Sequence, residues 1–505
     1  MHPDVRTPGS SLPMTPSRAR GSAALDFPGL PLLLRPALRA YVLGYASAVG
    51  PRLLTLLLQH ISRRRKKRLQ QQEDDQNEES FVDGLARIVR TGLEPQRFPA
   101  FCAALIGGNS LLLPLLKRVI DKSAASLSLA VRQRLARWLS AFITGWLSLR
   151  LLQSKDVPAK APHEDQAHGD DGVKATEKKP RASPWAGRTL DLTLFTITRA
   201  VDVLVGELWS QHRARRKGAQ KWSKTEQFAT DMIDPAVFAV SCGFIMWSWF
   251  YHPDALPRSY NKWITSAAMV DLRLIKALKR CKTGELLYGH ETGQAPLLGS
   301  MCADNGWPQV WGDPATTIPF PCEIVHMGCG SSCEYHAVSR FVRSWRWAMF
   351  TYLPLAVAFK MRKPSRQALA NAVVSACRSS AFLGTFITLF YYGVCLGRTR
   401  VGPKLLGTDT ASRQRIDGGV CVGTGCFLCG WSVLIETAGR RKDMALFVAP
   451  RALATVVPRR YPRSKQWRET AAFAASAAVV LTCVAENPKR VRGVLGGVLN
   501  MVTRE

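Results

Sequence analysis

The residue types best suited to chemistry lie close together in the middle of the chain. Cys322, His326, Cys333 and His336 fall within fifteen residues, with the spacings Cys-x3-His and Cys-x2-His. Thiolate and imidazole groups are the ligands that tetrahedral zinc selects in proteins. The spacing matches no standard zinc finger, so the residue types alone carry the hypothesis of a structural zinc ion.

The same part of the chain could instead contain disulfides. Cys322, Cys329 and Cys333 are close in sequence, and Cys281 and Cys302 could join them. A third possibility is that these residues form neither a metal site nor a disulfide. No general base or nucleophile stands out beside them, so we expect a protein that is not an enzyme. A zinc-dependent membrane enzyme centred on this cluster is an alternative hypothesis.

Long apolar segments surround the cluster and must position it. Residues 379–397 contain no charged side chain in 19 positions, and residues 418–435 contain none in 18. Residues 98–116 form a similar segment between Arg97 and Lys117. Each approaches the ~20 residues that a helix needs to cross a hydrocarbon core of ~30 Å. These segments predict membrane-spanning helices.

The charge of the chain is strongly positive. Lys and Arg number 69 against 37 Asp and Glu, which gives a net charge of +32. Such a charge indicates an anionic partner, either nucleic acid or a lipid surface. Nucleic-acid binding would explain the charge but not the apolar segments. We therefore predict the lipid bilayer and anionic lipids as partners, and no nucleic acid.

The apolar pattern is written twice along the chain. Phe142-Ile143-Thr144-Gly145-Trp146 recurs as Phe427-Leu428-Cys429-Gly430-Trp431, and three further matches keep the same order. The segments of the two copies lie near 98–116, 135–152, 190–206 and 236–252, and near 379–397, 418–435, 444–457 and 471–485. A repeat of apolar segments is typical of a duplicated membrane bundle. The predicted fold is an all-α polytopic membrane protein, with two four-segment helical modules joined by an irregular Cys/His region and six to nine crossings.

Composition shifts predict the boundaries of these parts. The expected order is a disordered tail at 1–27, a basic interfacial segment and charged linker at 28–96, a first membrane module at 97–256 with a disordered insertion at 153–187, a Cys/His-rich central region at 257–375, and a second module at 376–505. Pro36 and Pro51 are expected to break the helix in the interfacial segment. The arginines Arg340, Arg343 and Arg346, interleaved with aromatic residues, predict an amphipathic helix at a membrane interface.

Small residues at four-residue spacing predict close helix packing. Gly393 and Gly397 form one such pair, and Gly419 and Gly423 form another. One helical turn separates the members of a pair, so another backbone can approach the flat stripe between them. The predicted packing residues are Gly145, Gly393, Gly397, Gly419, Gly423 and Gly430.

Two arginines lie inside apolar segments, at the same position of each copy. Placing Arg199 or Arg451 in hydrocarbon costs about 2.5–3.5 kcal/mol on insertion scales, so each requires a reason. They could line a polar path in a transporter or translocation pore. They could equally reach the interface, or pair with a carboxylate such as Asp191 or Asp443. The shortness of these segments favours the structural explanation.

Particular runs of residues resemble a known family. The runs Pro321–His326, Ser332–Cys333, Tyr352–Leu355 and Arg378–Leu383 resemble the transmembrane protein 135 family, in its fungal form with a cysteine-rich motif. A more distant resemblance is to the channel-subunit superfamily of mitochondrial inner-membrane translocases. One departure is Met327, where the fungal pattern is expected to carry proline.

The resemblance implies a location and a role that the residues themselves do not carry. It implies an integral, multi-pass protein of the peroxisomal or mitochondrial membrane, involved in organelle dynamics or lipid metabolism, with partner membrane proteins possible. It transfers no catalytic residue to this chain.

Overall fold

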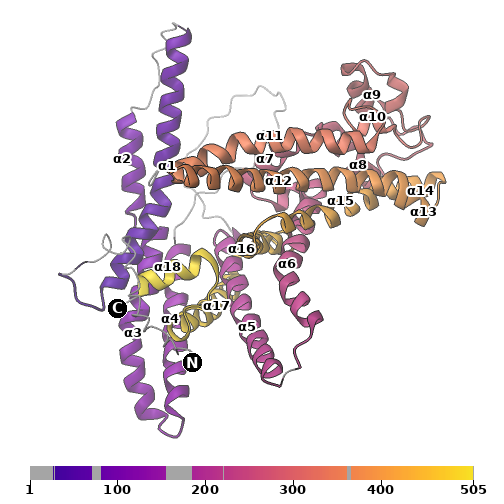
Figure 1. The fold of residues 1–505 in the computed structure, drawn as a ribbon. Coiled ribbons are helices and arrows are strands. Elements are labelled where there is room, and N and C mark those ends of the chain that lie inside the picture. The colour runs from indigo at the N-terminus through magenta and orange to yellow at the C-terminus, as the bar shows by residue number, and fades with distance from the viewer. Residues whose placement is uncertain are drawn as a thin grey trace, which may run out of the picture. The chain divides into compact units, whose positions relative to one another are not determined.

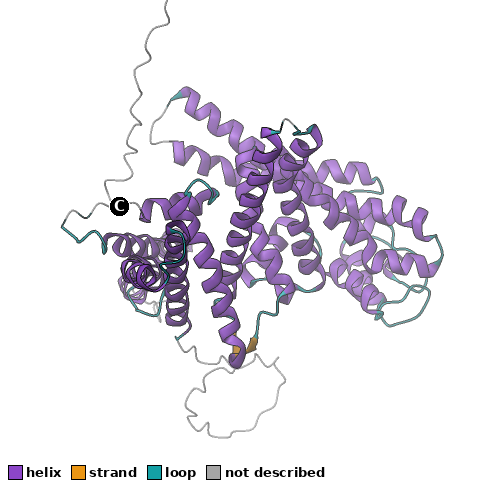
Figure 2. Cartoon of the chain, turned by 90° about the horizontal axis from the view of Figure 1, so that it is seen from below, coloured by secondary structure: helices purple, strands orange, loops and turns teal. Residues whose placement is uncertain are grey.

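The computed structural model describes residues 27, 29–70, 81–154, 185–219, 221–360 and 365–503. The predicted tail at 1–27 lies almost wholly outside the described residues, as does the interior of the predicted insertion at 153–187. The described part of the chain is 80% helical with almost no strand, which confirms the all-α prediction (Figure 2).

Residue contacts divide the chain into two compact units. One contains residues 1–155 and 497–505, and the other contains residues 156–496. This division departs from the predicted module boundary at 256. The segments near 190–206 and 236–252 pack against helices of the second predicted module. Apolar periodicity predicts that a face is buried but does not say which neighbour covers it.

The first unit is built from four helices. They are α1 (Arg35–Gln70), α2 (Phe81–Gly92), α3 (Phe98–Ser123) and α4 (Leu129–Gln153). Helix α3 packs against both α1 and α4. The prediction that Pro51 breaks the first helix is wrong, because α1 continues through it. Pro36 lies in the first turn, where a missing backbone N–H costs no helical hydrogen bond.

The second unit contains longer helices and a group of short ones. Its α-helices are α5 (Leu190–Gly218), α6 (Lys224–Tyr251), α7 (Arg258–Ala268), α8 (Leu272–Thr283), α9 (Ala295–Asp304), α10 (Cys322–Val325), α11 (Cys333–Lys360), α12 (Arg366–Leu396), α13 (Gly402–Leu406), α14 (Thr410–Arg415), α15 (Cys421–Cys429), α16 (Ala438–Val456) and α17 (Gln466–Glu486), and α18 (Gly493–Thr503) ends the described chain. Strand β1 (Trp185–Ala186) pairs antiparallel with β2 (Tyr461–Pro462).

Short turns of other helical types connect these helices. The 3-10 turns are η2 (Pro253–Ala255), η3 (Gln309–Gly312), η6 (Gly430–Ile435) and η7 (Arg463–Lys465), and the π-helical turns are η4 (Gly397–Val401) and η5 (Ile416–Val420). Single π-helical turns inside α-helices occur often at functional sites. Each of these turns contains a charged residue that borders an uncharged run, Arg398 in η4 and Asp417 in η5.

Six helical stretches of the described chain are long and apolar enough to cross a membrane. They are Arg35–Ile61, Phe98–Ser123, Lys224–Tyr251, Arg366–Leu406, Thr410–Ile435 and Arg463–Glu486. This finding supports an integral multi-pass membrane protein and lies within the expected six to nine crossings. The first stretch, predicted to be interfacial, has the length and composition of a span.

The predicted irregular region folds largely into short helices. Residues 257–332, here called the short-helix region, enclose a small core of their own that includes Leu286, Leu298 and Phe320. Helix α11 then runs beside α12 (Figure 1). The prediction that its arginines lie at an interface is wrong for Arg340, which is buried and donates to the carbonyls of Ala268 and Met269 at 3.2 Å.

Candidate metal centre

Three of the four predicted metal ligands come together where the short-helix region meets α11. Cys322 begins α10, His326 follows its last turn, and Cys333 begins α11. One potential ligand atom from each of these residues lies within 4.8 Å of the other two. The cluster could therefore hold a metal ion. Its residues are those that the sequence singled out, with His336 excepted.

A tight loop brings the cluster together. Between His326 and Cys333 the backbone reverses through left-handed conformations, with φ of 51° at Met327, 84° at Gly328 and 81° at Gly330. Glycine adopts such angles without strain. A proline at position 327 could not, because its ring holds φ near −65°. The departure from the expected fungal pattern therefore agrees with the loop geometry.

The hydrogen bonds of His326 prepare its ring for coordination. The ring is fully buried, and Nδ1 lies 2.8 Å from the carbonyl oxygen of Gly330. Because a carbonyl only accepts, Nδ1 carries the proton and Nε2 carries the lone pair. Burial lowers the pKa of His326, which favours the neutral ring. Metal-binding histidines are commonly oriented in this way by a second hydrogen bond.

Several neighbouring influences act on the pKa of the Cys322 thiol. Burial raises its pKa, while the positive charge of Arg398 lowers it. A neighbouring thiol, that of Cys333, lies within hydrogen-bonding reach and raises the pKa further. A divalent metal that binds the Cys322 thiol would have to displace its proton.

The fourth predicted ligand, His336, is not part of this cluster. Its ring stacks on that of His326, with centroids 4.4 Å apart and planes inclined by 13°, and its plane is nearly perpendicular to that of Tyr391 at 5.7 Å. Burial, followed by the charges of neighbouring basic residues, lowers the pKa of His336 to about 3. The Cys-x2-His spacing places Cys333 and His336 about 4.5 Å apart along the axis of α11. Only the thiol at the helix start reaches the cluster.

The structure forms none of the disulfides considered as an alternative, and all thirteen cysteines are free in it. Cys281 and Cys302 belong to the core of the short-helix region, and burial raises the pKa of Cys281 to about 12. Cys329 lies 3.9 Å from the hydroxyl of Ser339 and outside the cluster. Among the cysteines of the apolar segments, Cys421 and Cys429 are fully buried and pack as small hydrophobic residues, whereas Cys102 and Cys483 are partly exposed.

A buried ion pair lies next to the cluster. Arg398 in η4 contacts Asp417 in η5 through two hydrogen bonds, of 2.8 and 3.0 Å, and both side chains are at least 96% buried. The phenol of Tyr288 donates to the same carboxylate at 2.5 Å. The pair closes one end of an antiparallel hairpin formed by α12 and α15. It also connects that hairpin to the short-helix region.

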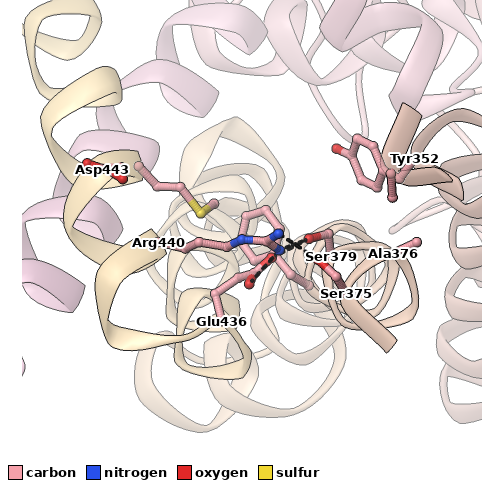
Figure 3. Close-up of a pocket in the computed structure, with 10 residues that line it drawn as sticks. Tyr352, Ser375, Ala376, Ser379, Glu436, Arg440 and Asp443 are labelled. Atoms are coloured by element: carbon pink, nitrogen blue, oxygen red, sulfur yellow. Dashed lines mark hydrogen bonds and ion pairs between the residues drawn. The ribbon is translucent and has the colours of Figure 1, made fainter. Parts of the chain in front are cut away.

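The other end of this hairpin carries a second polar group of residues. Ser379 on α12 donates to the buried carboxylate of Glu436 at 2.7 Å, and Arg440 donates to Ser379 and Ser375 at 2.6 Å (Figure 3). These residues line a cavity of about 350 Å³, with Tyr352 on its opposite side. The uncharged runs 379–397 and 418–435 therefore lie side by side, with polar contacts at both ends.

Three of the predicted packing glycines lie very close to another backbone. A Cβ atom on Gly393 would lie 2.7 Å from the Cα atom of Gly425, and one on Gly430 would lie 2.4 Å from the Cα atom of Ala239. Gly397 is similarly close to the backbone of Cys421. Gly419 and Gly423 are less restricted, because a Cβ atom on either would meet Trp247 at an ordinary contact distance. Gly145 is buried on α4.

The two in-helix arginines occupy different environments. Arg199 is buried on α5, donates to the carbonyl of Arg492 at 3.3 Å and lies over the ring of Phe195. Arg451 on α16 is partly exposed, and it lies over the ring of Phe447 and donates to its carbonyl oxygen at 2.6 Å. The two side chains do not share these partners. The polar path that would join them stays a prediction.

Sequence reasoning missed the residues that complete these contacts. Cys395, Arg398, Asp417, Gly425 and Glu436 were not singled out, although Arg398, Asp417 and Glu436 each border an uncharged run. A charge at each end of two neighbouring runs could have indicated paired ends of a hairpin. The role of Cys395 could not be predicted in this way, because a cysteine in an apolar helix is usually a packing residue.

No family model, no curated protein and no solved structure matches the chain.

Proposed function

We propose that this chain is a non-enzymatic, multi-pass protein of an organellar membrane, peroxisomal or mitochondrial, that acts in organelle dynamics or lipid metabolism. The single observation that supports a structural rather than a catalytic role is the complete burial of His326, the imidazole of the Cys/His cluster. His326 is fully buried between the Gly330 carbonyl and the ring of His336. Catalytic zinc sites keep an open position for water or substrate, whereas structural sites do not.

The proposal includes a structural zinc ion at the cluster of Cys322, His326 and Cys333. Thiolates and an imidazole nitrogen with a lone pair, such as Nε2 of His326, are the donor types that zinc prefers. The basic loops of the chain would contact anionic lipids, and exposed apolar helix faces would contact the bilayer or partner membrane proteins. The organelle and the role rest on the resemblance of the central motif alone.

Metal analysis tests the zinc component. The full chain, purified in detergent under reducing conditions, is expected to carry one zinc ion, because three donors of suitable type already converge. Cys322→Ser and His326→Ala should each abolish stoichiometric zinc, whereas Cys329→Ser should keep it, since that thiol lies in the same loop region but outside the cluster. A wild-type chain without zinc would contradict this part of the proposal.

Protease protection on isolated organelles tests the membrane component. If α12 and α15 both cross the bilayer, an epitope inserted beside Gly293 in the short-helix region and one inserted beside Gly439 on α16 must lie on opposite sides. Both positions are exposed, with open space around the backbone. Equal accessibility of the two epitopes in sealed organelles would contradict a spanning hairpin. Fluorescence of the tagged chain against peroxisomal and mitochondrial markers identifies the organelle in the same cells.

A further inference from the structure

The three-residue cluster lacks the fourth donor that a closed tetrahedral site requires, and the structure offers one from a distant segment. The Sγ atom of Cys395 lies 3.2 Å from Nε2 of His326. The same thiol is within hydrogen-bonding reach of the Cys333 thiol. Cys395 is 3% exposed and lies in the last turn of α12, at the end of an uncharged run. It therefore faces the cluster from the membrane hairpin.

We propose that Cys395 is the fourth ligand of a Cys₃His zinc site, and that the metal fastens the short-helix region to the end of the α12–α15 hairpin. This inference rests on the zinc site proposed above and adds its missing ligand and its mechanical role. Cys322 and His326 belong to the short-helix region, Cys333 begins α11, and Cys395 belongs to α12. A single ion would thus join three separate elements.

The orientation of His326 supports this assignment. The proton on Nδ1 is donated to the Gly330 carbonyl, so Nε2 accepts a hydrogen bond from the Cys395 thiol in the metal-free protein. Zinc would replace that proton between the two atoms. Coordination would release the protons of three thiols to solvent, leaving three thiolates, a neutral imidazole and a net charge of −1 at the site.

The competing fourth ligand is His336, as the local spacing predicts. The structure argues against it because the ring stacks flat on His326 at a centroid distance of 4.4 Å. Two imidazoles that share one metal direct their nitrogens toward a common point rather than stacking face to face. His336 would then act as an aromatic support for the His326 ring, with Tyr391 behind it.

Counting the ligands in the wild-type chain decides between these two arrangements. X-ray absorption at the zinc edge of the zinc-loaded full chain in detergent is expected to show three sulfur ligands and one nitrogen ligand. Two sulfur and two nitrogen ligands would assign the fourth position to His336 and overturn the role of Cys395, while zinc itself would remain. A chain that binds no zinc would instead contradict the proposed zinc site as a whole.

Variants add a second, independent readout. Cys395→Ala is expected to weaken zinc binding on the order of 100-fold or more, because even outer-shell partners of a metal site contribute 10–100-fold. His336→Phe keeps the aromatic stacking and should retain wild-type affinity, and Cys329→Ser is the matched cysteine control. If Cys395→Ala does not fold, the ligand count of the wild-type chain still decides. Unchanged affinity in a folded Cys395→Ala chain would overturn the assignment.

The mechanical role has its own measurement. Removal of zinc by a chelator from the wild-type chain should increase cleavage within the short-helix region in limited proteolysis, and restoring Zn²⁺ should reverse it. The Cys395→Ala chain should already be cleaved at the chelated rate with zinc present. Identical cleavage with and without zinc would mean that the metal does not fasten this region.

Mass spectrometry of non-reduced peptides tests the disulfide alternative. A peptide in which Cys322 is bonded to Cys333 would overturn the zinc site in favour of a disulfide.

Discussion

Asp417→Leu is expected to lower the free energy of unfolding by about 3–5 kcal/mol, because it leaves the Arg398 guanidinium buried without its counter-ion. Both side chains are at least 96% buried and joined by two short hydrogen bonds. The substitution also removes the acceptor of the Tyr288 phenol. Unfolding of the full chain in mixed micelles, followed by circular dichroism over a series of denaturing detergent fractions, measures the effect.

The double variant separates the cost of an unpaired charge from the contribution of the pair. Replacing both partners, Arg398→Met with Asp417→Leu, should recover most of the loss, since apolar replacements of a buried pair are often close to neutral. The exposed pair of Arg400 and Glu334 is the matched control, and Glu334→Gln should change stability by at most about 1 kcal/mol. If the double variant is as unstable as the single one, the unpaired charge is not the cause.

Gly393→Ala is expected to destabilise the hairpin by about 1–3 kcal/mol, the usual cost of overpacking a well-packed contact. The new Cβ would lie 2.7 Å from the Cα atom of Gly425, so the α12 and α15 backbones must move apart. Gly430→Ala should act similarly at the contact of η6 with α6, where Ala239 is the obstacle at 2.4 Å. The same detergent titration measures both variants.

Gly423→Ala is the matched control for these glycines. Its Cβ would meet Trp247 at 3.8 Å, an ordinary contact. Alanine is also the better helix former, by up to about 1 kcal/mol, so this variant should be neutral or slightly stabilising. A loss at Gly423 equal to that at Gly393 would show that the effect does not come from the close approach of backbones.

The amino-acid sequence by itself determined the helical and membrane character of the protein. Runs without charge at 379–397 and 418–435 have the length of a bilayer span, and the structure forms them as helices with short turns of other helical types. The location of the candidate metal centre could also be predicted from the sequence, because Cys322, His326 and Cys333 are close in the chain. These features depend on composition and local spacing, which need no knowledge of distant neighbours.

Only the tertiary structure decided which of these pieces meet. Local spacing predicted His336 as the fourth ligand, whereas Cys395, distant in the chain, reaches His326. The glycine spacing predicted Gly423 as a packing residue, but the close approach to Gly393 comes from Gly425, which is not among the predicted positions. The segments near 190–206 and 236–252 joined the second unit instead of the first. Periodicity specifies the face of a helix that is buried, but the partner for that face is selected by the complementary shape and charge of residues far away in the sequence.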